Sequence, residues 1–368
     1  MGKQRIFYLD NLRVLLTVLV VAHHWAIANG APGDAYYQDT SVSLVESIIL
    51  GLFIATNQAY FMGFFFFLSA FFTPKSLARK GKQLFFLDRL KRLGIPLLVY
   101  SFILEPLLKF WLGSSTGQIL AGFSSYWASG KGFGTGPLWF VAVLLIFDCC
   151  YAFLGSGLLN RLKPKSRTIR VIIGLLTLIL ITFVVRMYFP VGEWVSPLGF
   201  QPAHLPQYIL CYLSGIWVQQ HGVLDTWSGK AYFKNLIMAT ALALIVFPLL
   251  FVIPGKLEDH ADYMGGFTPY SFFYVVWEQL FAFFTILGLL GWFKTRFNEQ
   301  PPWLRSVAQH SYIIYIIHGF VLAGLSLALH NYTGMAFQKF VLFLVPALLI
   351  CYFLGKLIRL IPVVKRIV

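Results

Sequence analysis

Long apolar runs alternate along the chain with shorter polar stretches. Most of the runs are roughly 17 to 25 residues long, the length at which a helix crosses a hydrocarbon core of about 30 Å. The pattern predicts an all-α, polytopic membrane protein with ten transmembrane helices. The predicted spans are residues 12–28, 48–72, 93–111, 138–154, 169–189, 205–218, 236–253, 272–292, 307–327 and 340–360.

The composition agrees with this pattern. Of the 368 residues, 58% are hydrophobic and 12% are charged, which is about half the charged fraction of a typical soluble domain. The polar stretches are short, and no Pro/Ser-rich linker or internal repeat separates the runs. We therefore expect one transmembrane domain, residues 1–368, without an attached soluble domain. No cleavable signal peptide is evident, because the first apolar run continues for a full span.

Positive residues are distributed unequally between alternate loops. Of the 29 lysines and arginines, 23 fall in one set, which includes both ends of the chain, and five in the other (Lys109, Lys131, Arg186, Lys256, Lys339). Cytoplasmic loops of membrane proteins retain an excess of positive residues. The pattern predicts that both termini are cytoplasmic, and it explains the net charge of +15 without a nucleic-acid partner.

Six ionisable residues stand out inside the predicted spans and need a partner or a cavity, because a charged group in hydrocarbon costs a few kcal/mol or more. Asp148 is either neutral or paired with a neighbouring helix, and the lone carboxylate of Glu278 predicts a cavity beside it. The six are Arg13, His24, Glu105, Asp148, Glu278 and His318.

Arg13 and His24 lie 11 residues apart in the first span. Eleven residues are three helical turns plus about 20°, so the two side chains share a face, about 16 Å apart along the axis. The spacing predicts a path with Arg13 near its cytoplasmic entrance and His24 deeper. Alternatively, Arg13 reaches back toward the cytoplasm beside Asp10, and His24 is a hydrogen-bonded core histidine.

The predicted cytoplasmic loop after the second span holds seven positive residues and one acid between positions 75 and 92. Arg89 and Arg92 are one helical turn apart, with Lys91 between them. Guanidinium groups on one face present fixed donors that suit phosphate. The loop is therefore a candidate anion site, or alternatively a surface that contacts anionic lipid headgroups.

Tyr312, Tyr315 and His318 recur at one-turn spacing on an otherwise apolar helix. Such a polar stripe either holds helices together by hydrogen bonds or forms part of a functional path. Asp10, Asp148, Tyr315 and His318 are the candidates for that path. The four cysteines lie in or at the ends of apolar spans, so we expect small buried hydrophobes and no disulfide framework or metal site.

Six segments carry a resemblance to a known family. They are LDNLRVLLTVLVVAHH (9–24), FFFFLSAFFTP (64–74), DRLKRLGIPLL (88–98), GPLWFVAVLL (136–145), SYIIYIIHGF (311–320) and IPVVK (361–365). In this order on a ten-helix frame, the chain resembles the acyltransferase 3 membrane proteins, and within them the glucans biosynthesis protein C branch. Two positions depart from many relatives, which have Gly at Ala70 and His at Pro137. The second departure weakens any claim that the acceptor is shared.

The resemblance implies a multi-pass enzyme of the bacterial cytoplasmic membrane. It implies transfer of an acetyl- or succinyl-type group from cytoplasmic acyl-CoA, as co-substrate, to a carbohydrate hydroxyl outside the cytoplasm, with no tightly bound cofactor. Arg13 and His24 match the family's Arg-x10-His catalytic pattern, which His23 does not fit. Arg89 and Arg92 match a basic pair thought to meet acyl-CoA, and Lys91 lies between them. Glu278 and His318 match a late acidic residue and a recurrent histidine.

These residues together suggest a mechanism. We expect His24 to take the proton of the acceptor hydroxyl as the hydroxyl attacks the thioester, and then to protonate the leaving thiolate. Glu278 either orients the His24 imidazole or binds the acceptor. Two other classes of protein stay open on the residues alone. One is a transporter or flippase that makes no bond, and the other is an assembly subunit whose buried polar groups only pack.

Overall fold

The computed structural model describes residues 5–38, 42–115, 122–130, 132–154, 167–256 and 260–367. Several charged loop positions of the predicted topology lie outside these ranges, including Lys3, Asp39, Lys131 and residues 161–165. Within the described residues the protein is all-α, apart from one isolated bridge between Val195 and Phe200. The prediction of an all-α chain is therefore confirmed.

The chain forms a series of helices, and the elements written η are π or 3₁₀ turns. The first half contains α1 (Phe7–Ala28), α2 (Leu44–Gln58), α3 (Phe61–Arg89), η1 (Leu90–Gly94), α4 (Ile95–Val99), η2 (Tyr100–Leu104), α5 (Glu105–Ser115), α6 (Phe123–Ala128), η3 (Gly136–Leu138), α7 (Trp139–Leu154) and α9 (Arg167–Tyr188). The second half contains η4 (Pro202–His204), α10 (Leu205–Gln220), α11 (Val223–Thr226), α12 (Tyr232–Ala241), η5 (Leu242–Val246), α13 (Phe247–Val252), α14 (Ala261–Met264), α15 (Pro269–Arg296), α16 (Pro302–Ala328), α17 (Ala336–Ile358) and α18 (Pro362–Ile367).

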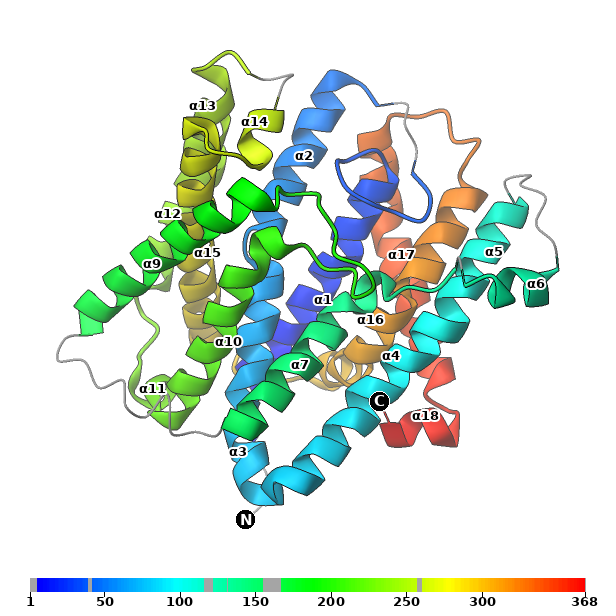
Figure 1. Ribbon diagram of the computed structural model, residues 1–368, viewed down its shortest axis with the longest axis horizontal. Coiled ribbons are helices and arrows are strands. Elements are labelled where there is room, and N and C mark those ends of the chain that lie inside the picture. The colour runs from blue at the N-terminus through cyan, green and yellow to red at the C-terminus, as the bar shows by residue number, and fades with distance from the viewer. Residues whose placement is uncertain are drawn as a thin grey trace.

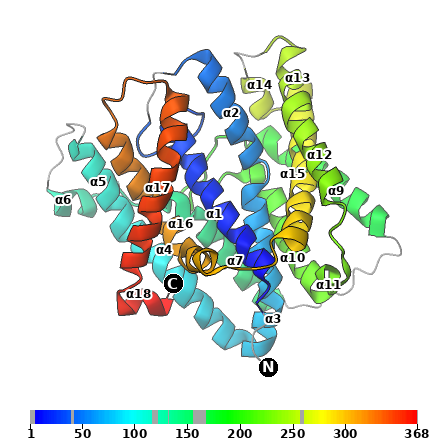
Figure 2. The ribbon, with the colours of Figure 1, turned by 180° about the vertical axis from the view of Figure 1, so that it is seen from behind.

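Helix α1 runs through the middle of the bundle (Figures 1 and 2). It packs against α2, α3, α15, α16 and α17, and Leu9, Leu12 and Trp25 on it are fully buried. The Trp25 indole donates to the Phe340 carbonyl of α17 at 3.1 Å. A polar residue on α1 therefore meets other helices, because little of this helix remains to face lipid.

Eight stretches of the described chain are long and apolar enough to span a membrane, two fewer than the ten predicted. One of them, Leu44–Ser114, contains both the second and the third predicted spans. The chain folds back within it at Gly81, whose φ of 73° is a left-handed conformation that glycine adopts readily. Helix α10 covers the sixth predicted span, but its 16 residues are short for a crossing.

The marked ends of the chain both lie toward the lower end of the bundle in Figure 1 and in the reversed view of Figure 2. Their predicted location in the cytoplasm stays a prediction. Helices α9, α12 and α17 carry many exposed aliphatic side chains, such as Ile173, Ile237 and Leu349. On membrane-spanning helices such side chains are the surface that meets lipid, so the lipid-facing rim and the buried polar groups of the interior are clearly separated.

Candidate functional site

Arg13 lies on the first half of α1, where it is held between α1 and α3. Its guanidinium donates to Asp10 at 3.1 Å and to the Leu68 carbonyl at 3.3 Å. The same guanidinium lies over the Phe72 ring, 4.5 Å from its centroid. The predicted partner Asp10 is therefore present, while about a third of the Arg13 side chain stays accessible. Arg13 is therefore hydrogen-bonded within the bundle, and part of its side chain remains accessible to a ligand.

His24 lies three turns farther along α1, with its tautomer set by its own helix. Its Nδ1 is 2.9 Å from the Val20 carbonyl, and a carbonyl can only accept, so Nδ1 carries the proton. In the neutral ring, Nε2 then holds a lone pair. An imidazole with a free lone pair at Nε2 can accept a proton from a hydroxyl, which is what a general base requires.

His318 of α16 faces His24, and the two ring centroids are 4.9 Å apart. The Nδ1 of His318 is 2.6 Å from the Tyr315 carbonyl, which again leaves Nε2 as the acceptor. His318 is fully buried, and its Nε2 has no hydrogen-bond partner among the described residues. The structure thus brings together His24 and His318, two predicted residues almost 300 positions apart in the chain. The Nε2 atoms of both rings can accept a hydrogen bond from a donor.

His23 points to a different part of the bundle. Its ring stacks on Phe61 at 5.0 Å between centroids, and its Nδ1 lies 3.2 Å from the Asn57 amide nitrogen. Adjacent residues of a helix point about 100° apart, so only one of the two histidines can face His318. His23, which does not fit the family's Arg-x10-His pattern, therefore lies outside the contact between His24 and His318.

The polar stripe on α16, formed by Tyr312, Tyr315 and His318, contacts three other elements: η1, η3 and α1. The Tyr312 hydroxyl donates to the Arg92 carbonyl at 3.1 Å, and the Tyr315 hydroxyl donates to the Pro137 carbonyl. Two members of the stripe are therefore packing groups, and His318 is the member that contacts the His24 ring. The bond to Pro137 is to its backbone carbonyl, which any residue at this position offers.

Arg89 and Asp148 form a buried ion pair that the sequence pattern does not predict. Arg89 Nε lies 2.9 Å from Asp148 Oδ2, and Asp148 accepts from Tyr212 at 2.7 Å and Thr73 at 3.0 Å. Asp148 is 1% exposed, so of its two predicted states the structure shows the paired one. Arg89 is engaged in this pair, so its guanidinium is directed into the bundle and not toward a ligand at the surface.

Arg92 and Lys91 lie on the surface instead, so the expectation that Arg89 and Arg92 share one face is wrong. Arg92 is 60% exposed and pairs with Asp88 at 3.1 Å. The physical reason is the π-helical turn η1, which begins directly after Arg89. A π turn holds more residues than an α turn, so a three-residue separation no longer places two side chains on the same face.

The two arginines give a direct stability prediction. Arg89→Leu is expected to lower the free energy of unfolding by about 3–5 kcal/mol, because it leaves the Asp148 charge buried without its partner. Arg92→Leu is expected to leave stability nearly unchanged, because an exposed ion pair contributes little. Equilibrium unfolding of both variants in mixed micelles measures the difference. Equal losses for the two arginines would contradict the assignment of Arg89 to a buried pair.

Glu278 belongs to a second buried ion pair, with Arg186 of α9. Arg186 Nη2 donates to Glu278 at 2.6 Å, the Gln279 amide donates to the same oxygen at 2.8 Å, and His204 Nδ1 lies 3.4 Å from the other oxygen. Among the described contacts of Glu278, none reaches His24. The carboxylate therefore orients a polar cluster on α9, η4 and α15, and an orienting role toward the His24 imidazole has no contact to support it.

Arg186 itself is a correction to the predicted topology, which counted it among the outward loop charges. Its side chain is fully buried, because α9 ends only at Tyr188 and turns this last arginine inward toward Glu278. The signal was present in the sequence, since Arg186 follows an uninterrupted apolar run. Its partner was unpredictable, because α15 is about 90 residues away along the chain.

A third polar cluster, near the outer end of the third predicted span, surrounds Glu105. Its carboxylate accepts from the Tyr36 hydroxyl and pairs with Lys109 at 3.0 Å. Burial, with the neighbouring Tyr100 and Glu105, raises the pKa of Tyr36 well above its usual range, so Tyr36 stays a donor. Gly136 closes the cluster: its φ is +46°, and a Cβ there would lie 2.6 Å from a Glu105 oxygen.

The described residues contain no group of three or more histidine, cysteine or acidic side chains arranged to hold a metal ion. The four cysteines are free. Cys351 is buried, as expected, whereas Cys150 is exposed, because it lies on the outer face of α7. The His24 and His318 pair is the candidate for chemistry that the geometry brings together.

Comparison with known proteins gives one match. A family model described as an acyltransferase domain matches residues 6–356, which is nearly the whole chain. No curated protein and no solved structure matches. The matched range contains α1 with Arg13 and His24, the Arg89 and Asp148 pair, and α16 with His318.

Proposed function

Since the chain belongs to the acyltransferase 3 family, and is thus an acyltransferase with membrane-spanning helices, we propose that it is an acyl-CoA-dependent O-acyltransferase. The donor is a cytoplasmic acyl-CoA carrying an acetyl- or succinyl-type group. The acceptor is a hydroxyl of an extracytoplasmic carbohydrate, and the membrane is the bacterial cytoplasmic membrane. The choice of a carbohydrate acceptor follows the expectation from the sequence motifs and is part of the proposal.

The lone pair on His24 Nε2 is the observation that carries this proposal. With Nδ1 committed to Val20, Nε2 takes the proton as the acceptor oxygen attacks the thioester carbon. The carbon–sulfur bond then breaks, and the imidazolium returns the proton to the thiolate, which leaves as CoA. Proton transfer by a positioned side chain contributes about 10²- to 10⁴-fold to such a reaction. His318 Nε2, unpartnered beside His24, is a second acceptor for the same hydroxyl.

The donor approaches this pair from the side of Arg13. Arg13 lies about three turns before His24 on α1, and its accessible side offers a positive charge to the donor's phosphates at the entrance. Because Arg89 is engaged with Asp148, we assign the CoA head group to two exposed cations of that loop, Lys91 and Arg92, the second of which exchanges its surface contact with Asp88 for phosphate. Ion pairing with phosphate is a common use of such exposed cations.

The proposal predicts that purified protein in detergent, given acetyl-CoA or succinyl-CoA, releases free CoA only when a carbohydrate acceptor is added. A thiol-reactive dye follows CoA release, and mass spectrometry of the acceptor detects the new ester. Protein without donor and protein without acceptor are the controls. Movement of acceptor across vesicles without CoA release would instead indicate a transporter.

A further inference from the structure

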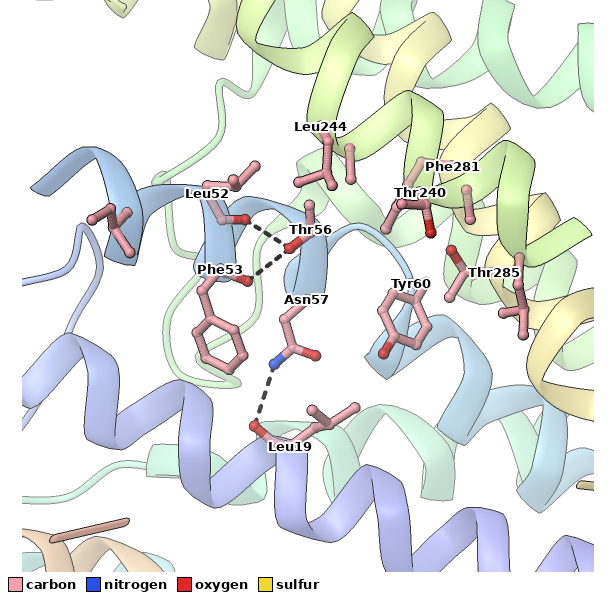
Figure 3. A pocket seen from close by; sticks show the side chains of 14 residues that line it. Leu19, Leu52, Phe53, Thr56, Asn57, Tyr60, Thr240, Leu244, Phe281 and Thr285 are labelled. Carbon is pink, nitrogen blue, oxygen red and sulfur yellow. Dashed lines mark hydrogen bonds between the residues drawn. The ribbon is translucent and has the colours of Figure 1, made fainter. Parts of the chain in front are cut away.

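A pocket of about 450 Å³ lies beside Leu19 of α1 and Asn57 of α2. It is bounded by α1, α2, α12 with η5, and α15 (Figure 3). Its size falls within the range of about 300–1,000 Å³ that is typical of small-molecule sites. Its walls are mostly aliphatic and aromatic, with Leu19, Leu244 and Phe281 among them. The pocket is therefore large and apolar enough for part of a lipid.

The open side of the pocket faces the lipid-exposed surface of the bundle. Ile49 of α2 and Leu244 of η5 line it and are 43% and 61% exposed. Both belong to stretches that are long and apolar enough to span a membrane. In a bilayer such exposed aliphatic side chains contact hydrocarbon chains, so a ligand enters from the membrane and brings a hydrocarbon part with it.

Two polar atoms that line the pocket lack partners. Asn57 Oδ1 and Thr285 Oγ1 have no hydrogen-bond partner among the described residues, and Asn57 and Thr285 are only 3% and 7% exposed. Figure 3 shows both side chains at the pocket, with the Asn57 amide nitrogen bonded to Leu19. Buried polar groups without a partner are rare and costly, above all where lipid replaces water, so these atoms indicate a missing ligand group.

The orientation of Asn57 fixes which chemistry the ligand must offer. Its amide nitrogen lies 3.3 Å from the Leu19 carbonyl and 3.2 Å from His23 Nδ1. Turning the amide over would set its oxygen against the Leu19 carbonyl oxygen, which repels it. The oxygen of Asn57 therefore faces the pocket as an acceptor, and its ligand must donate a hydrogen bond.

A hydroxyl satisfies this requirement, because it donates to Asn57, and an oxygen of the same ligand can accept from the Thr285 hydroxyl. An ester carbonyl or an ether oxygen only accepts, and so leaves Asn57 unpartnered. We propose that this pocket is a binding site for a lipid alcohol, a membrane amphiphile with a hydrocarbon body and a free hydroxyl. His24 and His318 are not among the residues that line the pocket, so the binding site does not rest on the proposed acyl transfer.

Photolabelling tests the proposal directly. The probe is a hexadecanol analogue with a diazirine and an alkyne, added to the full chain in phosphatidylcholine nanodiscs. We expect labelled peptides from the pocket-lining parts of α2, η5 or α15. Unlabelled hexadecanol is expected to compete at about tenfold lower concentration than hexadecyl methyl ether, because the ether leaves a buried acceptor unsatisfied. Equal competition by the two, or labelling elsewhere, would overturn the proposal.

Variants add a second readout on the same assay. Thr285→Val and Asn57→Leu are expected to reduce the preference for the alcohol over the ether, and Ala243→Phe, which fills the pocket, is expected to abolish labelling. Thr182→Val is the matched control, because Thr182 is another buried threonine with an unpartnered hydroxyl, on α9 outside the pocket. Acyl transfer is assayed separately, so a failure of the binding site and a failure of the proposed function are distinguishable.

Discussion

His24→Ala is expected to lower the rate of acyl transfer by about 10²- to 10⁴-fold, the contribution of a positioned general base. The variant removes the Nε2 lone pair that the Val20 contact leaves available. It leaves α1 itself intact, because alanine is the strongest helix former. CoA release at saturating donor and acceptor, measured at matched protein abundance, gives the rate.

Two other histidines provide controls for this result. His310 bonds its Nδ1 to the Ser306 carbonyl, one turn earlier in its helix, as His24 does with Val20. His310→Ala therefore repeats the same chemical change away from the His318 contact and is expected to retain transfer. His23→Ala tests the neighbouring face of α1. Full activity of His24→Ala, or a selective loss in His23→Ala, would remove His24 from its assigned role.

Glu278→Leu is expected to lower the free energy of unfolding by about 3–5 kcal/mol, because it leaves the fully buried Arg186 charge unpaired. The double variant Arg186→Leu/Glu278→Leu removes both charges and is expected to recover most of that loss. Replacing a buried pair by apolar side chains is often neutral or even stabilising. Equilibrium unfolding in mixed micelles gives the three free energies that the comparison needs.

The double variant also separates a structural role of Glu278 from a catalytic one. If the carboxylate only balances Arg186, the refolded double variant transfers acyl groups at nearly the parental rate. If Glu278 binds the acceptor, the double variant is stable and inactive. A single variant no less stable than the parent protein would contradict the buried pair itself.

The sequence predicts the helices well and their partners poorly, for physical reasons. Hydrophobic runs locate the spans because burial in lipid requires a fixed apolar length. The runs miss the polar ends of helices, so α15 extends to Arg296 and α16 begins at Pro302. They also cannot distinguish one stretch that folds back at Gly81 from two separate spans. The count of ten differs from the eight stretches of the structure because two predicted spans lie in Leu44–Ser114 and because α10, with 16 residues, is too short to be counted.

The candidate site shows the same division. Residues joined by helical spacing within α1, Arg13 and His24, could be predicted, because an α-helix repeats regularly. Arg89 and Arg92 could not, because η1 changes that repeat between them. The partners of Asp148 and Glu278 depend on which helices meet, and charge alone does not encode this. The contact between His24 and His318 could not be predicted either, because the two residues lie on different helices and local sequence patterns do not show which helices pack together.

The buried pair of Arg89 and Asp148 also constrains how this chain can evolve. Loss of either charge alone passes through an intermediate with an unpaired buried ion, which is less stable than both the paired state and a doubly apolar one. Selection on stability therefore blocks single steps in both directions. Across divergent descendants of this chain, we expect the two positions to change together or to be retained together, and a lone arginine or a lone aspartate to be rare.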